Sequence, residues 1–335
     1  LVAAVFICSL GSFLFAHSHT FFGAAIARIF MGASSAFAAI SCMELAGLWF
    51  KPSQFSFLTG LLLSFGMAGQ IFAEAPLSIA IRHTSWQSVY ETFTIVGFFL
   101  CLLVVLFITD HRKKTLQGTK HIDLFLMLKK QLCQVMASGQ TWLLALMAMF
   151  IYTPFLILIN TWGIAFLALK LSISLTHSAM LFSFTQIGFA VGAPILGAWS
   201  DWMQLRKPVF HLTIIGGFIL SLCIIFVPST YSIDWFRGFL FAFGFLTSGF
   251  LPAFTAAKEI HPPATRATTI GFLNTLNQFG GAIFVPLVGY VLTQLSHKKA
   301  VIHGISHYTL LEYQHVLFVI PLLFSNKLIS SHIAF

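Results

Sequence analysis

Apolar runs of about 20 residues recur along the whole chain and are separated by short polar connections. A run of about 20 apolar residues in a helix is long enough to cross the hydrocarbon core of a bilayer. We expect two internal prolines, Pro76 and Pro286, to kink the helices that contain them. The pattern predicts an all-α, multi-span membrane protein with ten spans: 1–16, 22–44, 55–80, 89–109, 140–166, 177–199, 209–227, 235–256, 268–293 and 314–331.

The composition supports this interpretation and excludes several other classes. The 335 residues are 58% hydrophobic and only 8% charged, which is too little polar surface for a soluble domain. The net charge of +9 comes from bases in short connections, so it indicates membrane topology rather than nucleic-acid binding. The five cysteines are scattered, and no CxxC, P-loop, GxSxG or HExxH motif occurs. We therefore predict no cofactor, no metal site and no catalytic residues.

The distribution of basic residues predicts the orientation in the membrane. The connection 110–139 carries six bases and is predicted to be cytoplasmic. Alternation of the spans then places twelve of the eighteen bases on that side. Within this connection, IDLFLMLKKQLCQVM has the pattern of an amphipathic helix, which we expect to lie along the inner membrane surface.

The same connection divides the chain into two parts that share a repeated pattern. Four spans lie in 1–109 and six lie in 140–335, with 110–139 as the linker. GLLLSFGMAGQIFAEAP (60–76) and GFLNTLNQFGGAIFVP (271–286) each have a second glycine nine residues after the first, followed by a proline. If the two parts are copies of six spans each, two further spans are expected before Leu1. Twelve spans in two similar halves is typical of secondary transporters.

Three segments resemble motifs of the major facilitator superfamily. GAWSDWMQLRK (197–207) resembles its signature loop, although the usual glycine between the acid and the arginine is missing. ARIFMGASSAF (27–37) resembles its fourth-span motif, and 60–76 is like its fifth span. The resemblance implies two pseudo-symmetric helical bundles with ten of the usual twelve spans present, in a monomeric transporter of the bacterial inner (cytoplasmic) membrane. NTWGIAFLALKLSIS (160–174) resembles the bacterial branch that imports amino acids or peptides in intracellular pathogens.

The signature loop supplies a predicted conformational gate. In the family, the acid equivalent to Asp201 contacts the start of a helix of the opposite half, where the helix dipole is positive; here that start is near 52–54. Gly197 is expected to let two helices pack closely, while Arg206 and Lys207 pair with acids or lie among lipid headgroups. The alternative is an ordinary positive loop end with no gating role.

Two ionisable residues inside predicted spans are candidates for substrate binding or coupling. Glu74 could carry a proton or pair with a substrate ammonium, and the alternative is a structurally paired acid. Arg28 could hold a substrate carboxylate, and the alternative is a side chain that extends to the outer headgroups. Arg237 is a weaker counterpart, close enough to Asp234 for a local ion pair.

Several neutral polar residues could line a path for a polar substrate. Residues three or four apart are neighbours on a helix surface, so Asn274 is expected to share a helix face with Asn277 and with Gln278. The alternative for any one of them is a hydrogen bond that joins two helices. The candidates are Asn160, Trp162, Gln186, Asn274, Asn277 and Gln278.

These observations together predict a secondary active transporter that moves a small organic solute by alternating access, with protons as the candidate coupling ion. An amino acid or short peptide ranks first as substrate, because Glu74 and Arg28 have opposite charges. Neutral sugars or other organic solutes are the alternative, as is a truncated copy that does not transport. A membrane-embedded enzyme is disfavoured, because no nucleophile or acid pair with a histidine occurs at matching depth.

Overall fold

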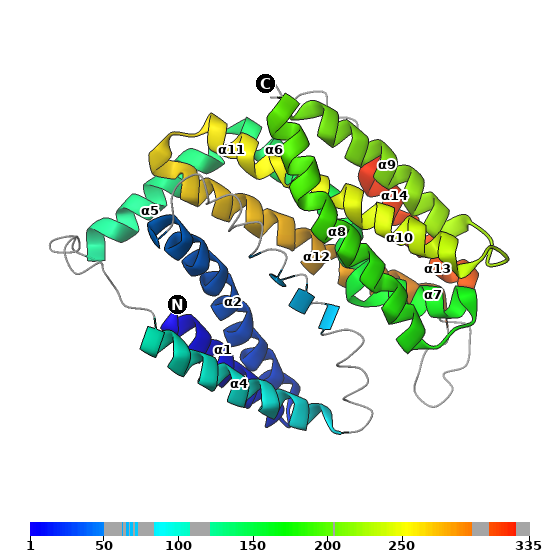
Figure 1. The fold of residues 1–335 in the computed structure, drawn as a ribbon, viewed down its shortest axis with the longest axis horizontal. Helices are drawn as coiled ribbons and strands as arrows, with labels where there is room; N and C mark the ends of the chain where they lie inside the picture. The colour runs from blue at the N-terminus through cyan, green and yellow to red at the C-terminus, as the bar shows by residue number, and fades with distance from the viewer. Residues whose placement is uncertain are drawn as a thin grey trace. The chain divides into compact units, whose positions relative to one another are not determined.

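The computed structural model describes residues 1–49, 84–107, 121–203, 205–296 and 308–325, together with a few isolated positions between 62 and 72. The described residues are almost entirely helical and contain no strand, as predicted (Figure 1). The chain divides into two compact units, residues 1–119 and 120–335, which are described in turn.

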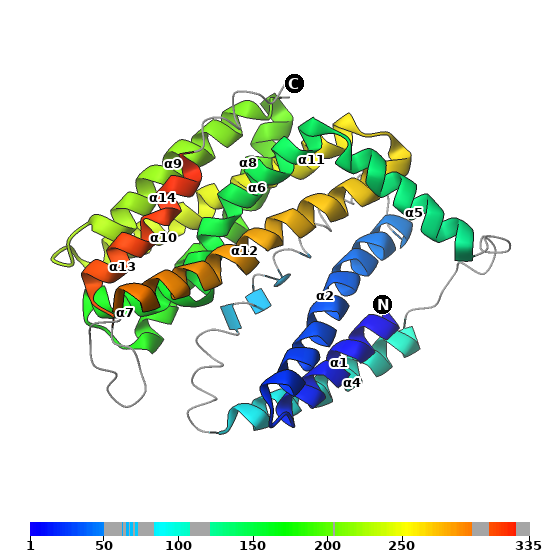
Figure 2. The same cartoon turned by 180° about the vertical axis from the view of Figure 1, so that it is seen from behind.

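The first unit contains three described helices. They are α1 (Val2–Ala16), α2 (Phe21–Trp49) and α4 (Trp86–Phe107), and α1 packs against both of the others (Figure 2). Small residues bring them together: Gly97 of α4 lies directly against Ser9 of α1, and a Cβ on Gly11 would come within 2.8 Å of Met31. Nearly all of the predicted span 55–80, including Glu74 and Pro76, lies outside the described residues.

The second unit is a larger helical bundle. Short π and 3-10 segments interrupt two of its spans. Its elements are α5 (His121–Met136), α6 (Gly139–Ile157), η1 (Leu158–Trp162), α7 (Gly163–Leu171), α8 (Leu175–Met203), α9 (Lys207–Phe226), α10 (Ile233–Thr247), η2 (Ser248–Phe250), α11 (Pro252–Ile260), η3 (Pro263–Thr265), α12 (Arg266–Ser296), α13 (Leu310–Leu317) and α14 (Val319–Phe324).

Glycines set the closest helix contact in this bundle, between α8 and α10. Gly188 and Gly192 of α8 lie against backbone atoms of Phe241 and Phe245, and Gly244 of α10 lies against the carbonyl of Thr185. Any larger side chain at these positions would push the helices apart. Spacing of small residues by four is a common way to bring membrane helices together, because their backbones can then approach closely.

Prolines explain where the observed helices depart from the prediction. The predicted span 235–256 is broken at η2, four residues before Pro252, and 314–331 is broken at Phe318, three residues before Pro321. A proline ring clashes with the carbonyl four residues earlier, which favours a break there. By contrast, α12 remains one helix through Pro286. The prediction of only two internal prolines was wrong, since Pro154 and Pro194 also lie inside helices.

The described helices confirm most of the predicted spans. Shorter apolar helices correspond to the predicted spans 1–16, 22–44 and 314–331. The 122–136 segment is helical as predicted, and its position on a membrane surface stays a prediction. Six described helices are long and apolar enough to cross a bilayer: Trp86–Phe107, Gly139–Ile157, Leu175–Ser200, Lys207–Phe226, Ile233–Ala257 and Arg266–Ser296.

Candidate functional site

The second unit has two ends, which we name by the predicted orientation. The end at which α6, α9 and α12 begin is the predicted inner end, and the end at which α8 and α10 begin is the predicted outer end. Arg206, Glu259 and His261 lie at the inner end. Lys170 and Arg237 lie at the outer end.

Arg206 anchors the α8–α9 connection at the predicted inner end. Its side chain is only 9% exposed; Nη1 donates to Ser200 Oγ across 2.9 Å, and Nη2 donates to Glu259 Oε1 across 2.8 Å. Glu259 belongs to the last turn of α11, so the ion pair joins the signature loop to a helix 53 positions further along the chain. An arginine can make both contacts at once because its planar guanidinium presents five N–H donors.

The other three gate candidates are Asp201, Lys207 and Gly197, which lie in α8 and at the start of α9. Asp201 lies in the last turn of α8, and its side chain lies outside the described residues, as does the predicted contact region 52–54. Lys207 is half-buried at the first position of α9. Among the described residues, no atom lies within 4 Å of a Cβ placed on Gly197, so the close contact expected there does not involve the described part of the bundle.

A histidine joins α11 to the start of α6, next to this loop. His261 is buried, and its Nε2 lies 2.6 Å from Oγ1 of the fully buried Thr141. Ser138 caps α6 by accepting a hydrogen bond from the Thr141 amide. His261 lies in the connection before α12, outside the spans, and burial lowers the pKa of its imidazole. Sequence reasoning missed this pair, because neither residue belongs to a recognisable motif.

The linker helix α5 is fastened to the same end of the second unit. Thr268 Oγ1 donates to Gln131 Oε1 across 2.9 Å, and Trp142 Nε1 donates to the Met136 carbonyl across 2.9 Å. Val135 is completely buried, whereas Lys129 and Lys130 are exposed. These contacts place the helical part of the linker in the second unit.

The polar residues of α12 fall on two different faces. Asn274 and Gln278, four residues apart, are both exposed, as their shared face predicts. Asn277 is 2% exposed and lies on the buried face with Leu273 and Gly280. The prediction that Asn277 shares a face with Asn274 was therefore wrong: three residues turn a helix by about 300°, and the edge of the buried face passes between them.

Buried oxygen atoms lie along the α6–α12 contact. Gly280 lies directly against Thr153 Oγ1. Among the described residues, Thr153 Oγ1 and Asn277 Oδ1 are buried and have no hydrogen-bond partner. Such atoms cost free energy when they are left unpaired, so this contact is a polar part of the bundle core.

Two further path candidates are held by helix packing. Trp162, at the end of η1, donates from Nε1 to the Val285 carbonyl across 2.9 Å, and its ring fills the space beside Gly289. Gln186 of α8 is completely buried. Asn160 lies in η1, and its side chain lies outside the described residues.

A buried lysine, which sequence reasoning did not single out, closes the predicted outer end of the bundle. Lys170 Nζ donates to the carbonyls of Ile224 and Ile225 across 2.7 and 3.0 Å, at the C-terminal end of α9. Gln314 Nε2 donates to the Ile225 carbonyl as well. A cation at a helix C-terminus is stabilised by the helix dipole. The only sequence signal was a lysine directly after a long apolar run.

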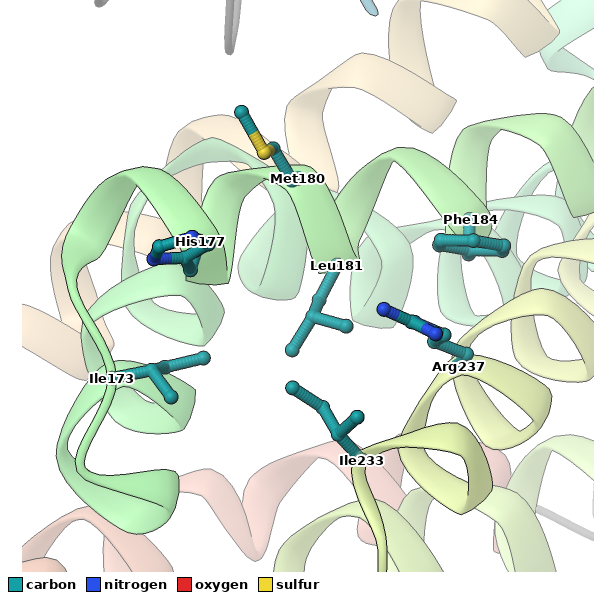
Figure 3. A pocket seen from close by; sticks show the side chains of 7 residues that line it. All are labelled: Ile173, His177, Met180, Leu181, Phe184, Ile233 and Arg237. Atoms are coloured by element: carbon teal, nitrogen blue, oxygen red, sulfur yellow. The ribbon is translucent and has the colours of Figure 1, made fainter.

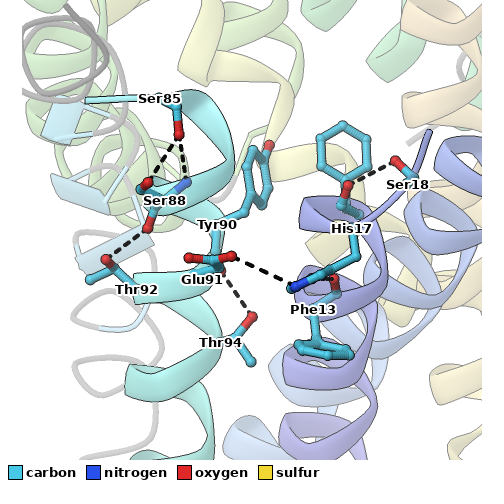
Figure 4. A network of polar contacts seen from close by, with 10 residues as sticks. Phe13, His17, Ser18, Ser85, Ser88, Tyr90, Glu91, Thr92 and Thr94 are labelled. Atoms are coloured by element: carbon cyan, nitrogen blue, oxygen red, sulfur yellow. Dashed lines mark hydrogen bonds and ion pairs between the residues drawn. The ribbon is translucent and has the colours of Figure 1, made fainter. Parts of the chain in front are cut away.

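In the first unit, Arg28 is held by aromatic side chains. Its Nη2 donates to Tyr90 Oη across 2.9 Å, and its guanidinium lies 4.5 Å from the centre of the Phe15 ring. Arg28 itself is exposed. Nearby, His17 Nε2 lies 3.7 Å from Glu91 Oε1 and joins the end of α1 to α4 (Figure 4). The described surroundings of Arg28 are therefore aromatic rather than acidic.

At the predicted outer end of the second unit, Arg237 pairs with Asp234 across 2.6 Å, as the sequence predicts. The described residues contain no group of three or more histidine, cysteine, aspartate or glutamate side chains able to hold a metal ion.

Comparison with known proteins identifies the family. A model described as Major Facilitator Superfamily matches residues 1–285. The chain belongs to the major facilitator superfamily. The predicted resemblance at family level is thus confirmed, and the protein is a multi-pass membrane transporter of that superfamily rather than an enzyme.

Solved structures of facilitators have the same fold. Two crystal structures of a bacterial homologue of the human lysosomal transporter Spinster, inward-facing and either occupied or unoccupied, match with TM-scores of 0.67 and 0.66 at 12% and 13% identity. These matches cover 98% and 96% of this chain and 80% of each of those chains. A mutant of the nucleoside transporter NupG matches with a TM-score of 0.68 at 13% identity, over 99% of this chain and 81% of that chain. No curated protein sequence matches the chain. At these identities the likeness shows the fold and leaves the substrate open.

Proposed function

We propose that this facilitator moves an amino acid or a short peptide across the bacterial inner membrane by alternating access, with the α8–α9 connection as its inner gate. The observation that supports the gate is the Arg206–Glu259 ion pair, which holds one side of this connection against the end of α11. Asp201 lies five residues before Arg206, in the last turn of α8. The loop is thus anchored in its own half by Arg206, while Asp201 is proposed to contact the other half.

The substrate proposal rests on two residues of opposite charge within predicted spans, Glu74 and Arg28. A zwitterion carries an ammonium and a carboxylate, which Glu74 and Arg28 could each bind. The Arg28 guanidinium has five N–H donors, and the hydrogen bond to Tyr90 uses one of them. The Phe15 and Tyr90 rings also hold the guanidinium in one position, so little side-chain entropy is lost when a carboxylate binds.

Proton coupling is proposed through Glu74, since a carboxyl group at membrane depth can take up and release a proton. The test is uptake into proteoliposomes with an imposed proton gradient. Glu74→Gln keeps the shape of the side chain and removes its charge. If this variant concentrates substrate as steeply as the parent protein, Glu74 does not carry the proton.

A neutral organic solute is the second candidate, and one observation favours it. The exposed face of α12 presents the amides Asn274 and Gln278, which bind hydroxyl groups and bases without requiring a charge. A fold relative is named as a nucleoside transporter, which makes nucleosides a sensible addition to sugars in a ligand panel.

Thermal stabilisation of the purified protein distinguishes the two candidates. A ligand that binds the folded state raises the melting temperature, and a concentration of 100 times Kd stabilises by about 2.7 kcal/mol. Amino acids and dipeptides should raise it, and Arg28→Gln should abolish that shift, whereas Lys130→Gln on the exposed face of α5 should not. A shift with sugars or nucleosides and none with any amino acid or peptide would overturn the ranking.

A further inference from the structure

A pocket of about 290 Å³ lies at the predicted outer end of the second unit, between the N-terminal parts of α8 and α10. Its wall is almost wholly apolar, and the exceptions are Arg237 and His177. Figure 3 shows Leu181, Ile233 and the guanidinium of Arg237 directed toward the same space. Apart from Arg237, the weaker counterpart of Arg28, none of the transport candidates named above lines it. The pocket is lined by Ile173, His177, Met180, Leu181, Phe184, Ile233 and Arg237.

Arg237 is the charged residue of the pocket wall and favours a ligand with negative charge. Arg237 is a permanent cation, and Asp234 takes one of its five N–H donors. The Asp234 side chain is 73% exposed, so water screens its charge strongly, while the guanidinium remains 5.8 Å from the centre of the Phe184 ring. His177 adds a second polar side chain to the wall, and its Nδ1 lies 2.8 Å from Ser174 Oγ. A ligand with an apolar body and an anionic end matches this wall.

The exposed surface of α8 continues the apolar pocket along the helix. Met180, Ile187, Val191 and Ile195 are all exposed and recur at spacings of seven, four and four, which places them on one face. The pocket volume is at the lower limit for small-molecule sites, so it holds only part of a long chain. The remainder of that chain would lie along the α8 face.

Arg237 lies at a depth in the predicted membrane that matches that of a lipid headgroup. Arg237 lies four residues after the start of α10, or about 6 Å along the helix axis at 1.5 Å per residue. The polar zone on each side of a bilayer has a similar thickness. His177 lies in the first turn of α8 at the same end.

We propose that the α8–α10 pocket binds an anionic phospholipid of the surrounding bilayer. Its phosphate is held by Arg237, and one acyl chain enters the pocket and continues along the exposed face of α8. The proposal concerns the second unit alone, and occupancy of the pocket does not depend on which solute is transported.

The test is native mass spectrometry of the protein in a lipid-free nonionic detergent, titrated with phosphatidylglycerol or phosphatidylcholine of the same acyl chains. The parent protein should bind one phosphatidylglycerol at least about ten-fold more tightly than phosphatidylcholine, because phosphatidylglycerol carries a net negative charge whereas the choline cation of phosphatidylcholine cancels the charge of its phosphate. Arg237→Gln should lose that preference, Arg237→Lys should keep part of it, and the exposed control Lys129→Gln should keep all of it. Ile233→Trp, which fills the pocket, should weaken binding of both lipids.

Three results would overturn the proposal. One is phosphatidylglycerol binding unchanged by both Arg237→Gln and Ile233→Trp. Another is equal affinity of the parent protein for the two lipids. The third is binding of free decanoate, an anionic chain without the glycerol headgroup, under conditions in which phosphatidylglycerol does not bind, since this would assign the pocket to a soluble carboxylate. Melting temperatures in detergent alone show whether each variant is folded. If Arg237→Gln does not fold, Arg237→Lys and Ile233→Trp provide the test.

Discussion

Arg206 and Glu259, 53 positions apart in sequence, form a 2.8 Å ion pair at the predicted inner end of the second unit. The arginine is buried and the carboxylate is half exposed, so the two partners do not contribute equally. Removing the arginine also removes its hydrogen bond to Ser200.

We expect Arg206→Ala to lower the free energy of unfolding by about 2–3 kcal/mol, because a buried charged group loses its hydrogen bonds to Ser200 and Glu259. Glu259→Gln should cost only about 1 kcal/mol, since solvent screens the half-exposed carboxylate. The matched control is Lys207→Gln, the adjacent half-buried base, with an expected change below about 0.5 kcal/mol. Thermal unfolding in detergent measures all three, and equal effects at 206 and 207 would contradict the anchoring role of Arg206.

Asp201→Asn tests the gate across the two halves. The variant keeps the side-chain shape and loses the charge, so we expect slower uptake with little change in the yield of folded protein. Glu91→Gln is a matched control, because this exposed acid belongs to the first unit, pairs with His17 and is not part of the signature loop. Initial uptake rates in proteoliposomes provide the measurement. Uptake by the Asp201 variant at the parent rate would remove Asp201 from the gate.

Close packing of α8 against α10 predicts opposite effects for two glycines on one helix. A Cβ on Gly244 would overlap the Thr185 carbonyl, so Gly244→Ala should destabilise by about 1–3 kcal/mol. Among the described residues, no atom lies within 4 Å of a Cβ on Gly238, so Gly238→Ala should be neutral or stabilise by about 0.5–1 kcal/mol through helix propensity. Melting temperatures of the two variants provide the measurement. If both substitutions lower the melting temperature, or both raise it, the close packing of α8 against Gly244 is contradicted.

His261 predicts a pH dependence of stability at the predicted inner end. Burial lowers the pKa of this imidazole, so the unfolded chain takes up a proton near pH 6.5 while the folded protein resists it. The contribution of His261 to stability is therefore complete above pH 6.5 and decreases as the pH falls from 6.5 toward the lowered pKa.

His261 contacts one neutral polar side chain and one basic side chain. Thr141 is neutral, and Arg266 Nε donates to the His261 carbonyl across 3.4 Å. In His261→Gln, an amide can still contact Thr141 but does not titrate, so the melting temperature should fall less between pH 7.5 and 5.5 than in the parent protein. Identical slopes for the two proteins would show that His261 is not buried in its neutral form.

The positions of the spans followed from the sequence because membrane helices are selected by hydrophobicity and length, which are local properties. The break before Pro252 was not predicted, although its cause, the clash of a proline ring with an earlier carbonyl, is local to the sequence. The resemblance of GAWSDWMQLRK to a known signature loop indicated the family, which the family match confirmed, and the local pair of Asp234 and Arg237 followed from their separation by three residues.

Tertiary packing alone decided which remote residues meet. Nothing in the local sequence pairs Arg206 with Glu259, Lys170 with the end of α9, or Trp162 with Gly289. These contacts depend on the angle and distance at which helices pack, which are set by glycines on facing helices such as Gly188 and Gly244. The same packing buries Asn277 and leaves Asn274 exposed one turn away, because the partner helix covers only one side of α12.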